Sequence, residues 1–195
     1  MLNKLKYFNC LKDARIDKNE FVIVNSAWLT LMDLRINGDL DIIISRKYWK
    51  KHYPEIPFNS SFGLPGECEK RLRVHPIEEG FYGKLKNIKD SDDVVYNHKV
   101  FVQGYPFVEP KLYFRYKLER MKRNKKIIDS LPWWKRNKFL SREQRKIFIK
   151  YSKDCSDFSL LKNYFTNIGH DNKGLSMISD DQWGLDDHEI NSLIR

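Results

Sequence analysis

The chain has 195 residues, of which 41% are hydrophobic, and it carries a formal net charge of +10. This composition indicates a folded globular protein and excludes a disordered chain. No apolar stretch approaches the roughly 18 residues of a membrane-spanning helix, and the first residues lack the apolar core of a signal peptide. We therefore expect a cytoplasmic protein without a membrane partner.

The three cysteines are Cys10, Cys68 and Cys155, and no two of them form a Cys-x-x-Cys pair. The five histidines are also dispersed and form no His-x-x-x-His pair. An odd number of widely spaced cysteines is typical of neither a disulfide framework nor a structural zinc site, so we predict neither.

The first quarter of the chain alternates between helix and strand patterns. The first twenty residues carry apolar side chains at helical spacing, residues 21–24 have strand composition, and residues 27–36 again predict a helix. Residues 40–45 form a nearly continuous apolar strand, which is typical of a buried position in a sheet. Helical turns are expected over 46–52, before prolines interrupt the pattern.

The middle of the chain combines a loop with further strands. Turn-forming residues dominate 54–66, where we expect an exposed loop. The alternating segment 71–75 predicts a third strand. Residues 99–108 predict a hairpin that turns at Gln103-Gly104.

Helical patterns follow the hairpin. One helix is expected to begin at Pro110, because proline is favoured at the first helical position, and to stop at Pro132. Ser141 and Gln144 have the spacing of a capping box and predict another helix that continues to about Tyr151.

The order of these elements predicts an α+β fold. We expect a small mixed β-sheet core with flanking helices over residues 1–108, followed by a helical C-terminal part over residues 109–195. The helical part is basic, ends in an acidic tail and is expected to pack on the core.

The most informative motif is Asp39-Leu40-Asp41, at the start of the second apolar strand. Because side chains alternate along a strand, both carboxylates are expected on one face. Adjacent carboxylates repel unless a cation lies between them, and a divalent metal with oxygen ligands is the usual partner. We therefore predict Asp39 and Asp41 as catalytic residues and ligands of Mg²⁺ or Mn²⁺. The alternative is that Asp39 only completes the turn begun by Asn37-Gly38.

Together with the segment before it, this motif resembles the first motif of the nucleotidyltransferase superfamily, which has a polymerase-β-like fold. The family pattern is an apolar strand, a Gly-Ser or Gly-Gly turn, a helix and an Asp-x-Asp pair; here it reads Val24-Asn25-Ser26, twelve residues, and then Asp39-Leu40-Asp41. The resemblance implies Mg²⁺-dependent transfer of a nucleoside monophosphate from a nucleoside triphosphate to a hydroxyl or phosphate acceptor. It also implies that Asn25 and Ser26 bind phosphate at a helix N-terminus.

The chain departs from the family pattern at two points. Asparagine replaces the turn glycine, although it tolerates a left-handed backbone better than most residues. The family's third carboxylate is not evident, because Arg71 and Arg73 occupy the expected strand. Glu109 is the candidate substitute, beside Glu67 and Glu69.

A later segment adds to the resemblance. Phe107-Val108-Glu109-Pro110, followed by Tyr116-Lys117-Leu118, is similar to a strand and helix of bacterial nucleotidyltransferase-like proteins. The resemblance implies that Lys117 binds phosphate, with Arg71 or Arg73 neutralising charge on the transferred group. The alternative for Lys117 is a solvated lysine on a helix.

Positive charge is concentrated between residues 111 and 150, where fifteen Lys and Arg residues face three acidic residues, a local net charge of +12. This stretch contains Trp133, Trp134, Lys135 and Arg136. Adjacent tryptophans can stack on bases while cations contact phosphates, which indicates a nucleic-acid contact. The alternative is that the two tryptophans pack at a helix corner.

Several hypotheses about function remain open. The leading one is a nucleotidyltransferase with a nucleoside triphosphate as donor. The second is a non-catalytic protein on a degenerate nucleotidyltransferase fold, which binds nucleic acid or another polyanion or acts as a regulator. Phosphotransferases that attach phospho-polyols to glycans use the same Asp-x-Asp pair. The sequence identifies neither the acceptor nor the oligomeric state.

Overall fold

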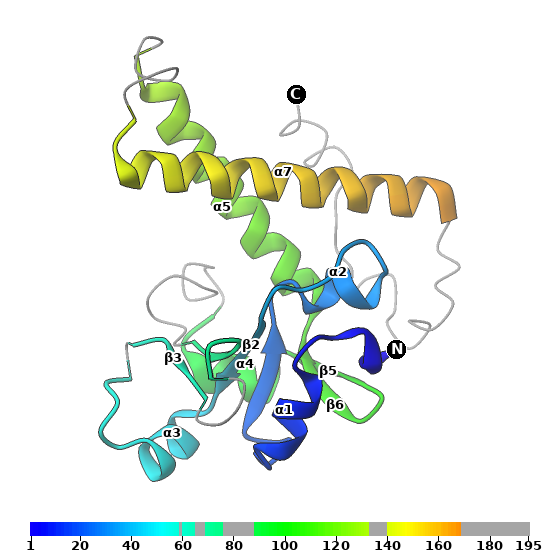
Figure 1. The fold of residues 1–195 in the computed structure, drawn as a ribbon, viewed down its shortest axis with the longest axis vertical. Coiled ribbons are helices and arrows are strands. Elements are labelled where there is room, and N and C mark those ends of the chain that lie inside the picture. The colour runs from blue at the N-terminus through cyan, green and yellow to red at the C-terminus, as the bar shows by residue number, and fades with distance from the viewer. Residues whose placement is uncertain (59, 65–68, 76–87, 133–139, 169–195) are drawn as a thin grey trace. The chain divides into compact units, whose positions relative to one another are not determined.

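The computed structural model describes residues 1–58, 60–64, 69–75, 88–132 and 140–168 (Figure 1). These residues belong to two compact units. The sheet unit contains Met1–Tyr113, and the helical unit contains residues 114–168.

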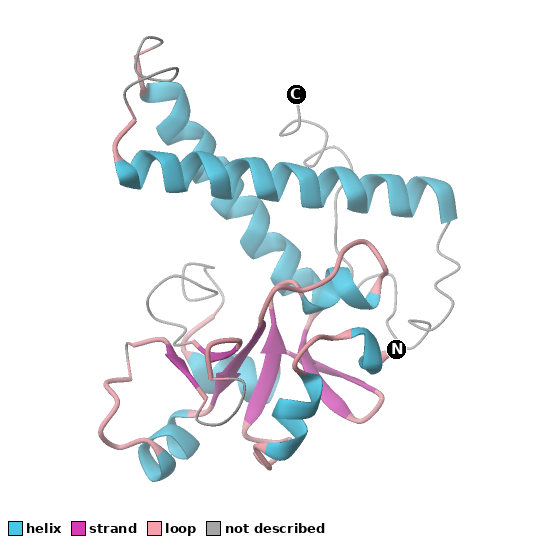
Figure 2. Ribbon diagram, viewed as in Figure 1, coloured by secondary structure: helices cyan, strands magenta, loops and turns pink. Residues whose placement is uncertain are grey.

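The sheet unit is built on a six-stranded mixed sheet of order β3-β4-β2-β1-β6-β5 (Figure 2). Its strands are β1 (Phe21–Val24), β2 (Leu40–Ile44), β3 (Phe62–Gly63), β4 (Leu72–Val74), β5 (Lys99–Val102) and β6 (Tyr105–Val108). Every residue of β1 and β2 is buried, which explains their continuous apolar patterns. The mixed sheet with its helices confirms the predicted α+β class.

Strand pairing brings several polar residues to one edge of the sheet. β1 runs antiparallel to β2 with Val24 opposite Asp41, and β2 runs parallel to β4 with Asp41 opposite Arg73. β6 runs parallel to β1 with Phe107 opposite Ile23. The C-terminal ends of β1 and β6 therefore lie at the same edge as the N-terminal ends of β2 and β4.

Short helices precede the first strand or connect later strands. They are the 3₁₀ helix η1 (Leu2–Lys4) and the α-helices α1 (Phe8–Asp13), α2 (Ala27–Leu31), α3 (Arg46–His52) and α4 (Ser91–Asn97). Side chains cap two of them: Ser45 Oγ accepts a hydrogen bond from Tyr48 N at 3.0 Å, and Asp90 Oδ1 accepts one from Asp93 N at 2.9 Å. These caps satisfy amides that have no partner within the helix.

Helix α2 ends at Leu31, five residues before the predicted end at residue 36. Asp33 adopts a left-handed backbone with φ of 60°. Its amide donates to Thr30 O at 3.1 Å, and the Leu34 amide donates to Leu29 O at 2.9 Å. These two bonds form a Schellman motif, which terminates the helix early.

The predicted hairpin over residues 99–108 is confirmed. β5 and β6 pair antiparallel from Lys99 opposite Val108 to Val102 opposite Tyr105. Gln103 and Gly104 both have positive φ, at 49° and 74°. Two positive φ values are the requirement of the two-residue turn that matches strand twist, and glycine at the second position meets it without strain.

The helical unit contains most of α5 (Pro110–Ser130), together with α7 (Arg142–Ile168). The predicted capping box is confirmed, because Gln144 N donates to Ser141 Oγ at 3.2 Å and Ser141 N donates to Gln144 Oε1 at 2.9 Å. The helix continues well beyond the predicted end at residue 151. Buried side chains at helical spacing extend it: Asp154, Asp157, Phe158 and Leu161.

The cysteines differ from the prediction. Cys10 in α1 is disulfide-bonded, whereas Cys155 in α7 is free. The prediction that the cysteines form no disulfide is therefore wrong for Cys10. Separation along the chain does not report the distance between two sulfur atoms in the fold.

None of the described helices combines the length and the apolar character needed to cross a bilayer.

Candidate functional site

The turn between β1 and α2 links directly to the Asp39-Leu40-Asp41 motif. Asn25 has a left-handed backbone with φ of 61°, a conformation that asparagine tolerates better than most residues. Its side-chain amide donates a hydrogen bond to Oδ2 of Asp41 at 2.8 Å. Ser26 follows at the N-cap position of α2, although its side chain makes no capping hydrogen bond. The structure thus brings Asn25 and Asp41 together, with Ser26 as the next residue of the turn.

Asp41 is a buried carboxylate with both oxygens in hydrogen bonds. Oδ1 lies 2.7 Å from Nε2 of His75, and Oδ2 accepts the amide of Asn25. Burial acts to raise the pKa of Asp41, but the hydrogen bond and charge of His75, the hydrogen bond of Asn25 and the charge of Arg73 outweigh it. The pKa of Asp41 therefore lies below its ordinary value, and the carboxylate is ionised at neutral pH.

His75 extends this hydrogen-bond network to the surface. It follows β4, and its Nδ1 lies 3.0 Å from Oγ of Ser61, an exposed residue directly before β3. No sequence motif predicts a role for either residue, because their proximity to Asp41 depends on the order of three strands in the sheet. One feature of the sequence pointed to His75: it lies two residues after Arg73, and side chains two residues apart share a face of a strand.

Asp39 is half-buried and precedes β2. Within the described ranges, no group of three or more His, Cys, Asp or Glu side chains is arranged as a metal site. Two carboxylates still suit Mg²⁺, which is usually bound through one or two carboxylates, waters and substrate phosphates. An ionised carboxylate offers about four lone-pair sites, so the two hydrogen bonds to Asp41 leave sites for a metal.

The predicted arginines flank this region, and the predicted third carboxylate has another partner. Arg73 lies opposite Asp41, and Nη1 of Arg71 lies 3.5 Å from the carbonyl of Gly38. Oε2 of Glu109 lies 3.4 Å from Nδ1 of His98. Glu109 is therefore paired with His98, whereas the ring that contacts Asp41 is that of His75.

Lys117 requires a correction, because it is neither exposed to a phosphate ligand nor solvated. The residue is 3% exposed, and its ammonium forms ion pairs with Asp157 and, at 3.1 Å, with Asp154 of α7. Arg120 binds both oxygens of Asp154, at 2.8 and 2.6 Å. Phosphate could reach Lys117 only by breaking these buried pairs. Trp133, Trp134, Lys135 and Arg136 lie outside the described residues.

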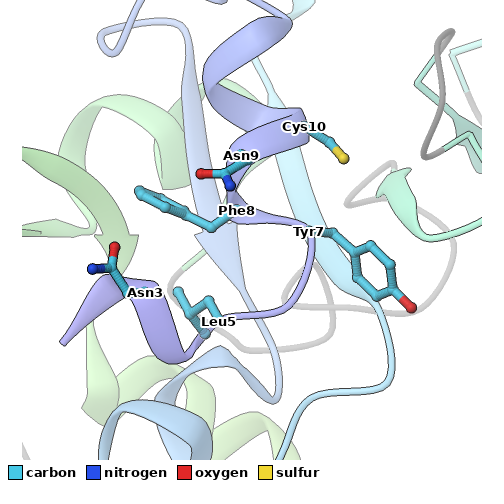
Figure 3. A pocket seen from close by; sticks show the side chains of 6 residues that line it. All are labelled: Asn3, Leu5, Tyr7, Phe8, Asn9 and Cys10. Carbon is cyan, nitrogen blue, oxygen red and sulfur yellow. The ribbon is translucent and has the colours of Figure 1, made fainter.

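A pocket of about 330 Å³ lies beside the N-terminal helices (Figure 3). It is lined by Asn3, Leu5, Tyr7, Phe8, Asn9 and Cys10. Buried Asn37 ties this segment to the aspartate motif: its side chain accepts from Lys6 N at 3.0 Å and donates to Lys6 O at 3.1 Å and to Asp39 O at 2.9 Å. The Asn37 side chain therefore links the backbone of the segment that lines the pocket to the backbone of Asp39.

The sheet unit is an α+β domain with a polar site at one sheet edge, formed by one ionised carboxylate and its hydrogen-bonded neighbours. Comparison of the chain with protein-family models, with curated proteins and with solved structures found no match.

Proposed function

We propose that the sheet unit is a metal-dependent nucleotidyltransferase, which transfers a nucleoside monophosphate from a nucleoside triphosphate to a hydroxyl or phosphate acceptor. The observation that carries this proposal is the hydrogen bond between Asn25 and Asp41. It joins a left-handed turn at a helix start to an ionised carboxylate on the next strand. Phosphate and metal would thereby meet at one edge of the sheet.

Asp39 and Asp41 would hold Mg²⁺ or Mn²⁺. A metal held by these two carboxylates would supply positive charge against the negative charge that develops during the transfer. The hydrogen bonds from Asn25 and His75 hold the Asp41 carboxylate in one orientation, as outer partners commonly do for metal ligands.

The remaining residues would bind the anionic part of the donor. Arg73, opposite Asp41, is exposed and would contact phosphate oxygens without leaving a buried partner unpaired. Arg71 lies beside Gly38, next to the aspartate motif. Ser26 and the backbone of the Asn25 turn would complete phosphate binding.

A second candidate function is supported by the partners of Asp41. Because Asn25 and His75 each occupy one of its oxygens, the carboxylate is satisfied without a metal. A non-catalytic protein that keeps this fold for binding or regulation needs only these hydrogen bonds to Asp41 and no metal. Its ligand would be nucleic acid or another polyanion, given the +10 net charge.

Thermal unfolding in the presence of metal and nucleotide tests the two functions. We would measure the full-length protein with Mg²⁺ or Mn²⁺ and each nucleoside triphosphate, beside the variants Asp41→Asn and Asp39→Asn. Asp13→Asn is the matched control, because Asp13 is an exposed carboxylate in α1. A ligand that binds only the folded state raises its stability, by about 2.7 kcal/mol at one hundred times its Kd.

The transferase predicts a metal-dependent rise with at least one triphosphate, which is lost in Asp41→Asn and kept in Asp13→Asn. Full transferase activity in Asp39→Ala would contradict the metal assignment. If no metal and nucleotide pair raises the unfolding temperature, the binding function is favoured. Affinity for single-stranded nucleic acid that falls steeply with salt would then support it.

A further inference from the structure

Three side chains form a hydrogen-bonded series from the interior of the sheet unit to its surface. Asp41 accepts from His75 at 2.7 Å, and the other ring nitrogen of His75 lies 3.0 Å from the hydroxyl of Ser61. The side chains of Asp41 and His75 are 11% and 13% exposed, whereas Ser61 is an exposed residue. The series is buried at its carboxylate end and open at its hydroxyl end.

The sheet itself sets this arrangement. β3 pairs antiparallel with β4, and Phe62 lies opposite Val74. The next residues outward on the two strands are Ser61 and His75, so the register places them face to face. Asp41 is supplied by β2, the other neighbour of β4. Three adjacent strands thus contribute one residue each.

The direction of the hydrogen bonds follows from the chemistry of the groups. An ionised carboxylate only accepts, so Nε2 of His75 must carry the proton that it shares with Asp41. When the imidazole is neutral, the other nitrogen, Nδ1, is an acceptor, and the Ser61 hydroxyl donates to it. In that state the hydroxyl proton points at a base.

Satisfying Asp41 does not require Ser61. The carboxylate has Asn25 and His75 as partners, and water could reach Nδ1 of His75 as readily as it reaches the exposed serine. We infer that Ser61 is an activated nucleophile toward phosphorus electrophiles, with His75 as its general base and Asp41 as the residue that orients His75. Arg73, opposite Asp41, supplies the positive charge that favours a phosphoryl substrate.

The reaction needs no oxidant, reductant or further reactant. Ser61 Oγ attacks phosphorus while its proton passes to Nδ1 of His75. The Oγ–P bond forms, the bond from phosphorus to the leaving group breaks, and the leaving group departs with that electron pair. The Asp41 carboxylate stabilises the imidazolium, which then gives its proton to the leaving group or to solvent.

A fluorophosphonate probe tests this inference directly, because attack by serine displaces fluoride and leaves a stable adduct. The full-length protein would be treated with the probe, and the adduct located by peptide mass spectrometry. We expect labelling at Ser61 in the wild type. It should disappear in Ser61→Ala and persist in Ser60→Ala, the matched change at the preceding serine. Loss of the base in His75→Gln should slow labelling about 100-fold or more.

The inference is overturned if Ser61 in the folded wild type acquires no adduct, or if His75→Gln is labelled as fast as the wild type. Circular dichroism of each variant shows whether slow labelling reflects unfolding, and the exposed position of Ser61 makes Ser61→Ala safe in this respect. Labelling requires neither metal nor nucleotide. Its failure therefore leaves the proposed transferase untouched, and a failed nucleotide titration leaves the nucleophile untouched.

Discussion

Two buried polar clusters, one in the sheet unit and one in the helical unit, are built in opposite ways. In the sheet unit, a single carboxylate is held by Asn25 and His75, and its hydrogen bonds lead outward to the exposed Ser61. In the helical unit, two cations meet two carboxylates. Lys117 pairs with Asp154 and Asp157, whose side chains are 0% and 2% exposed.

The pKa values alone do not distinguish a site from a structural cluster. Burial lowers the pKa of Lys117 even though Asp154 and Asp157 oppose it. The pKa of Asp41 is also lowered, there by hydrogen bonds that outweigh burial. What differs is access, because the Asp41 cluster ends in the exposed Ser61, whereas the most accessible side chain of the other cluster, Arg120, is 21% exposed. A partner that reaches the surface is therefore the better indication of a functional site.

The largest expected effect comes from disrupting the cluster of Lys117, Arg120, Asp154 and Asp157, which we call the closed cluster. Asp154→Ala removes the carboxylate shared by the buried Lys117 and the part-buried Arg120, so each cation loses an ion-pair partner. Breaking such a pair costs about 3–5 kcal/mol. Urea unfolding followed by circular dichroism measures this loss. Glu143→Ala, which removes an exposed ion pair with Lys146 in the same helix, should change the free energy of unfolding by less than about 0.5 kcal/mol.

The next effect concerns the cluster of Asp41, Asn25, His75 and Ser61, which we call the open cluster. This effect depends on pH. Asp41→Asn removes a charge that accepts two hydrogen bonds, at a cost of about 1.5–3 kcal/mol near neutral pH. Because the pKa of Asp41 is lower in the folded than in the unfolded protein, its contribution is present above about pH 4 and is lost as the pH falls through the folded pKa. Wild type and variant should therefore converge in stability in acid, as urea titrations from neutral to acidic pH would measure. A constant gap at all pH values would contradict this account.

Asn37 offers a test of the segment beside the open cluster. Asn37→Ala removes a side chain that serves both backbone groups of Lys6 and the carbonyl of Asp39. We expect a loss of about 1–2 kcal/mol, because these groups are left without their partner. Asn9→Ala is the control, since Asn9 is an exposed asparagine of α1. Equal unfolding midpoints for the two variants would show that Asn37 holds nothing in place.

The elements that the sequence predicted are those set by local chemistry. The central strands follow from unbroken apolar runs, the hairpin from Gln103-Gly104, and the capping box from Ser141 and Gln144. The early end of α2 was missed, because a left-handed Asp33 has no strong sequence signal. Local propensity predicts where an element exists better than where it ends.

The candidate site was predictable only in part, for the same reason. Asn25 and Asp41 belong to consecutive elements, so their proximity follows from a strand, a turn, a helix and a strand. His75 and Ser61 reach Asp41 only because β3 and β4 stand beside β2, which no local pattern specifies. Lys117 was misplaced because its partners, Asp154 and Asp157, lie beyond the predicted end of their helix.

The smallest expected effect separates the two roles of Asn25 in the open cluster. Asn25→Gly keeps the left-handed turn but removes the amide that donates to Asp41, whereas Asn25→Ala also strains the backbone at φ of 61°. The alanine variant should therefore be less stable than the glycine variant by about 1 kcal/mol. Paired urea titrations resolve such a difference.

The same pair of variants sharpens the functional argument. Asn25→Gly frees Oδ2 of Asp41 and lets phosphate approach the turn backbone more closely. If the open cluster binds a metal and a triphosphate, the thermal shift that they cause should be larger in Asn25→Gly than in the wild type. A smaller shift would mean that the amide itself contacts the ligand, and the turn would then differ in mechanism from the glycine turn that it resembles.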